Sequence, residues 1–318
     1  MTSGADRLRP EWASLPPALR SAVIGAIGGR FVSDSPAHGG FSASYAGVVV
    51  TTVGRAFVKA CGVDWHTDSL QFLREEIRAV SMLPPHLGPS VLTTIETDAG
   101  AALVLEAIDG RHPGAPWTSG DLDAVAASMA RLSGTPAPEQ MERAEDRMIP
   151  GFTRWAQIAE DPLLLSGLPS PLRAQVPVLM EVEKGVRDAL HGDAVVHDDL
   201  RADNILICEG EARLLDWPHA RRGAPWVDLP CFLPSVEASG GPRCEDAWRI
   251  FEVHGAPAQH ALLPVISGFA SFLWFNQAQP EVPQLPGLRA FQRQQALPAL
   301  RWLTSLLTGT TAEGIPLA

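Results

Sequence analysis

Lysine is nearly missing from this chain of 318 residues. Of its 25 basic side chains only two are lysines, Lys59 and Lys184, and the rest are arginines. Acidic residues outnumber basic ones by 36 to 25, so the formal net charge is −11. Nucleic-acid phosphates are bound by clustered Lys and Arg, so this balance argues against a nucleic-acid partner. A position that does keep lysine is a candidate for a role that needs a compact ammonium group.

Paired cysteines, a signal pattern and long apolar runs are also missing. The four cysteines form no C-x-x-C pair, which argues against structural zinc and a disulfide framework and favours free thiols. No basic-then-apolar signal opens the sequence. The longest apolar stretch, residues 261–275, contains Pro264 and Ser267 and is too short to span a bilayer. We therefore expect a cytoplasmic protein without a membrane partner.

The composition that remains is that of an ordinary globular protein, at 46% hydrophobic and 19% charged residues. The length allows two domains or lobes. The acidity is uneven, because residues 181–216 contain ten Asp or Glu and four Lys or Arg. Such a field favours Mg²⁺ and cationic molecules. Solvated helix and loop faces explain many of those charges equally well.

The first third of the chain has the pattern of a small sheet with one main helix. A short helix is expected over 17–27, ending at Gly28–Gly29. The main helix is expected over 68–83, because Leu70, Leu73, Ile77 and Val80 recur at spacings of three and four. Strands are expected at 48–53, 56–60, 91–95 and 102–108.

The side chains of two adjacent acids on the main helix, Glu75 and Glu76, point in different directions. At about 100° per residue, Glu76 lies near the apolar stripe and Glu75 points away from it. Lys59 lies in the strand-like run 56–60, so Glu76 is the better candidate for an ion pair with it. The alternative for Glu76 is a boundary residue in a surface pair.

Beyond residue 108 the pattern is mostly helical, and we place a lobe boundary there. A helix over 121–132 has Thr118 or Ser119 as its cap. Further helices are expected near 139–148 and over 170–190, 243–253, 258–278 and 287–308. No internal repeat is present.

The most informative stretch runs from residue 195 to residue 216. Two apolar runs flank a polar loop, and a third apolar run ends in an acid. The loop and the acid match the kinase pattern H-x-D-L-x-x-x-N followed by a metal-binding Asp, at His197, Asp199, Leu200, Asn204 and Asp216. Phosphoryl transfer needs these parts: a base for the acceptor hydroxyl and oxygen ligands that hold Mg²⁺ against the phosphates. The alternative is a polar hairpin in which Asp199 and Asn204 only cap turns.

With these residues in this order, the chain resembles the aminoglycoside phosphotransferase and choline-kinase-like branch of the protein-kinase-like fold. The stretches that carry the resemblance are Gly39–Ser42, Phe57–Ala60, His197–Leu206, Leu215–Pro218 and Phe291–Gln292. The resemblance implies an α+β, bilobal fold. A small β-rich N-terminal lobe with one main helix would span 1–108 and bind nucleotide. A larger, mostly helical lobe would span 109–318 and carry catalysis and acceptor binding.

The resemblance also implies roles for the catalytic residues. Asp199 would orient or deprotonate the acceptor hydroxyl, and Asn204 and Asp216 would hold Mg²⁺. His197 would brace the loop. Arg201 would meet the transferred phosphate, although a surface ion pair with Asp203 explains its charge equally well.

On the nucleotide side, Lys59, positioned by Glu76, would contact the α- and β-phosphates of ATP, or of GTP. The backbone from Glu106 to Ile108 would hold the purine. Gly39, Gly40, Phe41 and Ser42 would form a loop over the phosphates, although the full G-x-G-x-x-G spacing is absent.

Departures from the family pattern narrow the range of possible acceptors. Trp217–Pro218 replaces the Phe-Gly of protein kinases and no Ala-Pro-Glu segment follows, which argues against a protein substrate. Asp198 stands where many antibiotic kinases carry Gly, and would either favour a cationic acceptor or repel phosphate. We expect phosphorylation of a hydroxyl on an aminoglycoside-like antibiotic or another amino-bearing metabolite. Choline, sugar, homoserine and macrolide acceptors remain open, as do AMP transfer and a catalytically idle nucleotide-binding module.

Overall fold

The computed structural model describes residues 10–37, 44–65, 67–114, 116–282, 285 and 287–312. The chain forms two compact units. The first extends to His112 and also takes in Asp203–Glu209 and Arg213–Ala220; the second comprises Pro113–Ala202, Gly210–Ala212 and Arg221–Ala318. The expectation from sequence treats the first lobe as one continuous stretch to about residue 108. The first compact unit instead includes two segments from the motif-bearing stretch.

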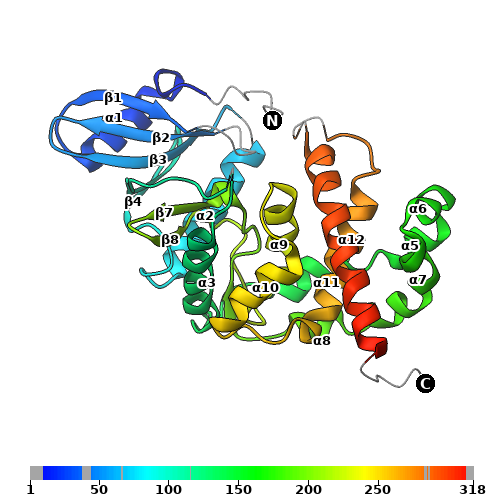
Figure 1. Ribbon diagram of the computed structural model, residues 1–318. Coiled ribbons are helices and arrows are strands. Elements are labelled where there is room, and N and C mark those ends of the chain that lie inside the picture. The colour runs from blue at the N-terminus through cyan, green and yellow to red at the C-terminus, as the bar shows by residue number, and fades with distance from the viewer. Residues whose placement is uncertain are drawn as a thin grey trace. The chain divides into compact units, whose positions relative to one another are not determined.

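The first unit is built on an antiparallel sheet of five strands among the described residues (Figure 1). The strand order is β1-β2-β3-β5-β4. The strands are β1 (Phe31–Pro36), β2 (Tyr45–Thr51), β3 (Arg55–Gly62), β4 (Val91–Thr97) and β5 (Gly100–Glu106). The helical elements are η1 (Trp12–Ser14), α1 (Pro17–Ile27) and α2 (Thr67–Met82). β1 was not expected from the sequence, because its side chains are almost all exposed and lack alternation.

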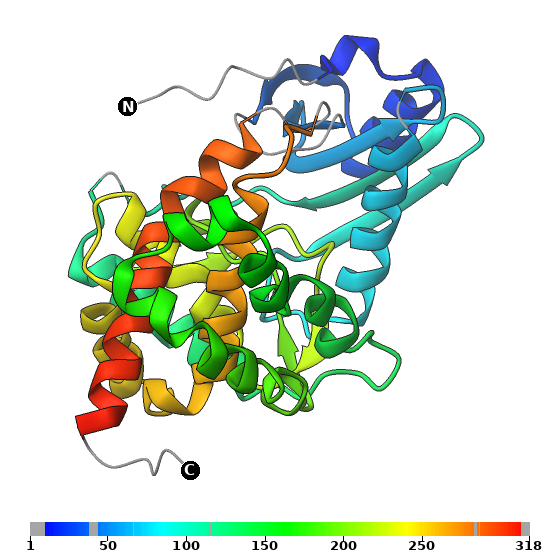
Figure 2. The ribbon, with the colours of Figure 1, turned by 90° about the vertical axis from the view of Figure 1, so that its right-hand side faces the viewer.

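Alternation along the strands gives this sheet two apolar faces. Ala56, Val58 and Ala60 of β3 join Leu19 and Val23 of α1 in one cluster. Phe57 and Cys61 of β3 belong to a second cluster with Leu70 and Leu73 of α2. Helices α1 and α2 therefore cover opposite faces of the sheet, as Figure 2 shows. Successive strand residues point to opposite faces, so Lys59 points to the α2 side.

The segments that return to the first unit carry the second half of the motif. η2 (Ala202–Asn204) leads into β7 (Ile205–Cys208), which pairs with β8 (Glu211–Leu214). Arg111 and Ile207 exchange backbone hydrogen bonds, with N···O distances of 3.1 and 2.7 Å. His112 Nδ1 lies 2.8 Å from the carbonyl oxygen of Ile205. These contacts attach β7 to the segment that follows β5.

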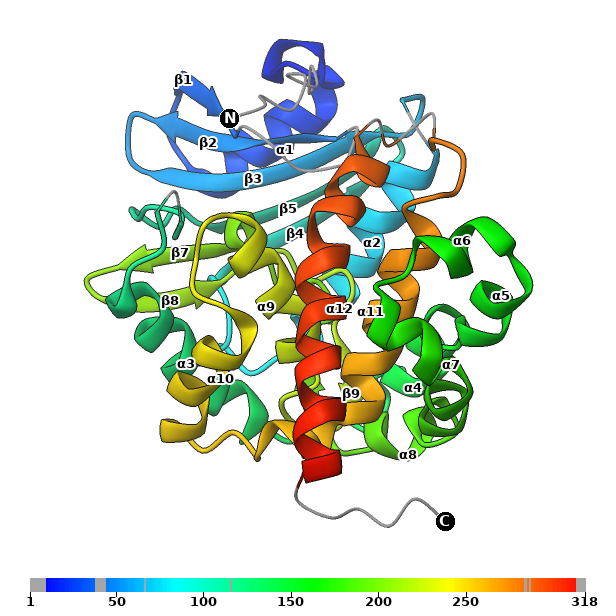
Figure 3. The same cartoon turned by 45° about the vertical axis from the view of Figure 1, so that its right-hand side comes forward.

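The second unit is mostly helical. Two short strands, β6 (Ala194–Val196) and β9 (Arg221–Gly223), pair antiparallel within it. Its helical elements are α3 (Ser119–Ser133), α4 (Ala144–Phe152), α5 (Trp155–Glu160), α6 (Pro162–Gly167), α7 (Ser170–Glu183), α8 (Val186–Leu190), α9 (Asp228–Ala238), α10 (Cys244–Val253), η3 (Gln259–Leu262), α11 (Leu263–Asn276) and α12 (Leu288–Ala312). Helices α11 and α12 pack side by side (Figure 3). The α+β class expected from the sequence is confirmed.

Several helix boundaries differ from expectation. The helix expected over 170–190 is two helices, because the chain turns at Lys184–Gly185 between α7 and α8. The helix expected near 139–148 is α4, which begins five residues later. The two caps considered for α3 are distinguished, since the Thr118 side chain accepts a hydrogen bond from the backbone N–H of Asp121. No helix within the described ranges is long and apolar enough to cross a membrane. The expected cytoplasmic location stays a prediction.

Candidate active site

Lys59 is held between two carboxylates within the first unit. Its Nζ lies 2.5 Å from Oε1 of Glu76 on α2 and 2.7 Å from Oδ1 of Asp216. The Lys59 and Glu76 side chains are 15% and 5% exposed, whereas Asp216 is 41% exposed. The expected pairing of Lys59 with Glu76 is therefore present. Glu75 makes a different contact, accepting a hydrogen bond from Gln71 on the same helix.

Burial and charge act against each other at this triad. Burial alone would lower the pKa of Lys59, but Asp216 and Glu76 outweigh it and raise that pKa above its ordinary value. Lys59 therefore stays positively charged. Burial raises the pKa of Glu76, and the adjacent Lys59 ammonium opposes that shift. A charged lysine with one exposed carboxylate partner is suited to bind phosphate oxygens.

The expected metal ligands lie on neighbouring backbone segments. The backbone N–H of Leu215 donates to the carbonyl oxygen of Asn204 over 2.8 Å, which places Asp216 beside the end of η2. Asp216 has a left-handed backbone, with φ 66°. Trp217 is buried and donates from its indole to the carbonyl oxygen of Leu214. A Cβ on Gly88 would lie 2.8 Å from this indole nitrogen, so a side chain at that position would displace Trp217.

The donor types at Asn204 and Asp216 fit a hard divalent cation. One amide and one carboxylate supply oxygen, and Mg²⁺ is commonly bound by one or two protein oxygens, with phosphate oxygens and water completing the shell. Asp216 Oδ1 also contacts the Lys59 ammonium, at 2.7 Å. We find no disagreement between these residues and a bound Mg²⁺.

The loop that follows β6 is held by a buried acid in the second unit. Asp228 at the start of α9 accepts hydrogen bonds from the backbone N–H groups of His197 and Asp198, at 2.9 and 2.8 Å. His197 is fully buried, and its Nδ1 accepts from the backbone N–H of Asp199 at 3.3 Å. His197 therefore has the bracing contact expected from the sequence. The side chain of Asp199 remains 32% exposed.

Asp228 is the functional candidate that sequence reasoning missed. It stands 30 residues from Asp198, within the run 225–229, and its role depends on long-range backbone contacts. No local pattern marks such a contact in the sequence.

Burial affects the carboxyl groups of both Asp198 and Asp228, and Asp228 also influences the titration of Asp198. Burial raises the pKa of Asp198 to about 8, and the neighbouring Asp228 adds to that shift while Arg221 and Arg147 oppose it. Burial raises the pKa of Asp228 to about 6, against the two backbone N–H groups that it accepts. Asp198 is therefore mostly uncharged at pH 7. Its expected attraction for a cationic acceptor is correspondingly weak at that pH.

Arg201 lies beside Asp199 in the second unit. Its guanidinium nitrogen is 3.8 Å from Oδ1 of Asp199, and its guanidinium carbon is 5.4 Å from the ring centre of Phe291 on α12. The Arg201 side chain is 18% exposed. The ring and the carboxylate together restrict where this guanidinium can lie.

The segment expected to hold the purine follows β5. Glu106 exchanges two hydrogen bonds with Ser90: its N–H donates to the Ser90 carbonyl, and its side chain accepts from the Ser90 N–H, both at 2.9 Å. The backbone N–H of Glu106 is thus occupied within the sheet. In the described part of the chain no hydrogen bond involves the backbone of Ile108, which leaves it available to a ligand. Gly39, Gly40, Phe41 and Ser42 lie outside the described residues.

The expected site residues thus form two groups. Lys59, Glu76, Asn204 and Asp216 belong to the first unit, together with Glu106 and Ile108. Asp199 and Arg201 belong to the second, with Asp228.

Comparisons with known proteins bear on the family and the fold. A family model described as "Phosphotransferase enzyme family" matches residues 35–263. Among solved structures, the choline kinase LicA from Streptococcus pneumoniae is similar, with a TM-score of 0.56 and 14% identity over 91% of this chain and 98% of that one. A choline/ethanolamine kinase family protein from Mesorhizobium loti has a TM-score of 0.54 and 14% identity, over 95% and 94%.

An aminoglycoside-3'-phosphotransferase of type VIII has a TM-score of 0.50 and 21% identity, over 79% of this chain and 97% of that one. No curated protein matches the chain. At these identities the likeness shows the fold, which is the protein-kinase-like fold expected from the sequence.

Proposed function

We propose a function from one premise: the chain belongs to the phosphotransferase enzyme family. Within that family, the protein transfers the γ-phosphate of ATP to a hydroxyl of a small, amino-bearing molecule. The observation that carries this proposal is the position of Lys59 between Glu76 and Asp216. Those contacts keep a charged ammonium beside an exposed carboxylate, which is the pairing that phosphates and their metal require.

On the nucleotide side, Lys59 binds phosphate oxygens and Glu76 fixes its direction. The backbone near Ile108 bonds the purine, and Asn204 and Asp216 hold Mg²⁺. Mg²⁺ held by these residues would neutralise the charge that develops on the phosphates during transfer. GTP is the alternative nucleotide, because backbone recognition leaves no side-chain signature of the base.

On the acceptor side, Asp199 orients the hydroxyl and accepts its proton. Asp228 and His197 hold the backbone of this loop in place, so the carboxylate of Asp199 needs little reorganisation when an acceptor binds. Arg201, fixed by Asp199 and Phe291, supplies a positive charge for the transferred phosphate. Catalysis on this scheme is positioning and charge stabilisation, with no covalent intermediate on the protein.

For the acceptor we propose an aminoglycoside-like antibiotic or another amino-bearing metabolite. The surplus of acids in residues 181–216 favours cations, and the names of the similar structures include choline and aminoglycoside kinases. Choline, sugars, homoserine and macrolides stay within the same reaction class. A role in antibiotic resistance would follow only from an antibiotic acceptor.

The test is acceptor-dependent release of ADP from MgATP across amines, amino sugars, aminoglycosides, peptide antibiotics and macrolides. We expect one acceptor class to give turnover, and Asp199→Asn to lower it by about 100-fold or more while nucleotide affinity is kept. Asp188→Asn makes the same charge change on an exposed residue of α8 and should leave turnover unchanged. Nucleotide binding without turnover for any acceptor would favour the idle module, and release of pyrophosphate would indicate AMP transfer.

A further inference from the structure

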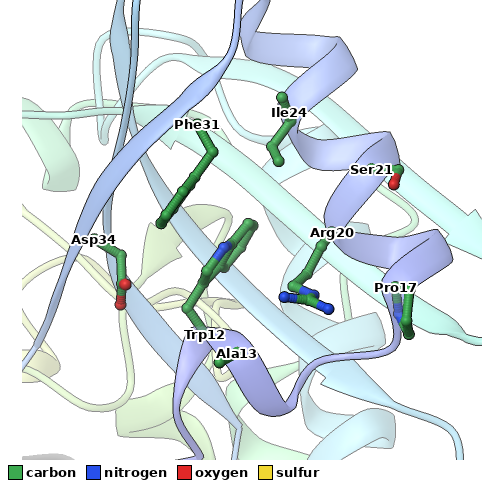
Figure 4. A pocket seen from close by; sticks show the side chains of 8 residues that line it. All are labelled: Trp12, Ala13, Pro17, Arg20, Ser21, Ile24, Phe31 and Asp34. Atoms are coloured by element: carbon green, nitrogen blue, oxygen red, sulfur yellow. The ribbon is translucent and has the colours of Figure 1, made fainter.

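The first unit contains a pocket that takes no part in the proposed reaction. It has a volume of about 410 Å³ and is lined by residues of η1, α1 and β1 (Figure 4). Pockets of about 300–1,000 Å³ are typical of small-ligand sites. None of the proposed phosphate-binding residues lines it, so a molecule held there is bound without being phosphorylated there.

Stacked aromatic rings form one wall of this pocket. The ring centres of Trp12 and Phe31 are 5.8 Å apart with an angle of 8° between their planes. Tyr45, fully buried beneath them, packs against Trp12 at 5.4 Å and 59°. Trp12 is 5% exposed and Phe31 is 40% exposed. The wall is therefore rigid at its base and accessible to the ring of a ligand.

Arg20 supplies a positive group without a counter-charge. Its Nε is buried and has no hydrogen-bond partner among the described residues. No described acid forms an ion pair with its guanidinium either. A buried donor that lacks an acceptor is rare in folded proteins. Because a guanidinium is always charged, an anion would suit this position, and a planar carboxylate matches the geometry of Arg20.

Asp34 supplies a negative group in the same pocket. Its Oδ2 accepts a hydrogen bond from the Tyr45 hydroxyl at 3.3 Å. A carboxylate can accept several more, so Asp34 has capacity left for a ligand's N–H groups. Figure 4 shows Asp34 and Arg20 on opposite sides of the Trp12 ring, and they form no ion pair with each other. The pocket thus presents separate positive and negative groups beside an aromatic wall.

We propose that this pocket binds a free α-amino acid with an aromatic side chain. Its carboxylate bonds to Arg20, its ammonium group to Asp34, and its ring packs on the Trp12–Phe31 pair. A simple anion such as phosphate would be repelled by Asp34, and a simple cation by Arg20. A zwitterion is favoured by both charges, and the aromatic wall selects a flat apolar side chain.

Isothermal titration calorimetry on the full chain tests this proposal with three matched probes. L-Phenylalanine carries both charges, phenethylamine lacks the carboxylate, and 3-phenylpropionate lacks the ammonium group. We expect L-phenylalanine to bind with a Kd below about 1 mM, and each analogue to bind at least about tenfold more weakly. L-Tryptophan and L-tyrosine extend the comparison to larger rings.

Single-residue variants measure the contributions of Arg20 and Asp34 to binding separately. Arg20→Gln and Asp34→Asn should each weaken the binding of L-phenylalanine by at least about tenfold. Arg30→Gln removes an exposed guanidinium near the start of β1 and should leave the affinity unchanged. Phe31→Ala, on an exposed ring, provides a further test if a charge variant fails to fold by circular dichroism.

Several outcomes would overturn the proposal. These are no binding of any aromatic amino acid, equal binding of 3-phenylpropionate and L-phenylalanine, or unchanged affinity in both charge variants. Binding that appears only after removal of residues 1–9 would assign the pocket to the chain's own N-terminal segment, and would overturn it as well.

Discussion

Lys59 shows how much one side chain can depend on distant partners. Glu76 lies 17 residues away in the sequence and Asp216 lies 157 residues away, yet both contact the same ammonium group. The other lysine, Lys184, pairs with Glu181 three residues before it, and its side chain is 71% exposed. Lys59, itself largely buried, therefore forms ion pairs with distant residues, whereas Lys184 forms an exposed ion pair with a near neighbour.

This contrast gives a prediction. Lys59→Met should lower the free energy of unfolding by about 3 kcal/mol, because Glu76 is left buried without its cation. Lys184→Met should change it by less than about 0.5 kcal/mol, since exposed pairs contribute little. Urea unfolding measures both, and the double variant Lys59→Met/Glu76→Gln should recover part of the loss. Equal effects of the two lysine variants would contradict this account.

Asp198 provides a prediction about pH. Its pKa is about 8 in the folded protein and 3.8 as its ordinary value, so the folded state binds more protons than the unfolded state between these limits. Stability contributed by the neutral carboxyl is present at low pH and is lost as pH rises from about 4 through about 8.

Asp198→Asn removes this loss. We expect the variant to gain about 4 kcal/mol on the wild type between pH 5 and pH 9, because the wild type loses about 1.4 kcal/mol per pH unit from about pH 5 to about pH 8. Thermal unfolding at a series of pH values measures the difference. Asp188→Asn on exposed α8 should show no such trend, and a pH-independent effect of Asp198→Asn would argue against the raised pKa.

Single residues also show where sequence reasoning succeeds and where it stops. The helical wheel separates Glu76 from Glu75 because both lie on one regular element whose apolar stripe is visible in the sequence. Asp228 could not be found in the same way. Its function is to accept two backbone N–H groups from a loop about 30 residues earlier, and such contacts leave no periodic pattern.

Helix α3 allows a test at the scale of an element. Thr118 and Ser119 are both plausible caps in the sequence, but only Thr118 forms the capping box with Asp121. Thr118→Ala should lower the free energy of unfolding by about 1 kcal/mol. Ser119→Ala is the matched control and should change it by less than about 0.5 kcal/mol. Chemical denaturation distinguishes them, and a larger effect at Ser119 would mean that the cap is misassigned.

The elements themselves were predictable where pattern and boundary signals agree. Pro17 and Gly28 bracket α1, which begins and ends where expected. Helix α9 was not expected, because Pro230 and Pro234 lie within Asp228–Ala238 and prolines usually stop helices. The break between α7 and α8 was missed because apolar residues continue at helical spacing on both sides of Lys184 and Gly185.

For the whole molecule, the discontinuous first unit gives a further prediction. A fragment that ends at His112 lacks Asp216 and the backbone bonds between Arg111 and Ile207. We expect its sheet to unfold at a lower temperature than in the full chain, because an ion-pair partner and a strand contact are lost together. Circular dichroism measures this, and an unchanged midpoint would show that the returning segments add no stability.

The same discontinuity sets an order of events during synthesis. At about 5–20 residues per second, the ribosome releases Asp216 roughly 8–30 s after Lys59, given the 157 residues between them. Throughout that interval Glu76 is the carboxylate already available to Lys59. The nascent chain can therefore fix α2 against its sheet well before it acquires Asn204 and Asp216. A growing chain would be able to hold its lysine in place before it has the means to bind a metal.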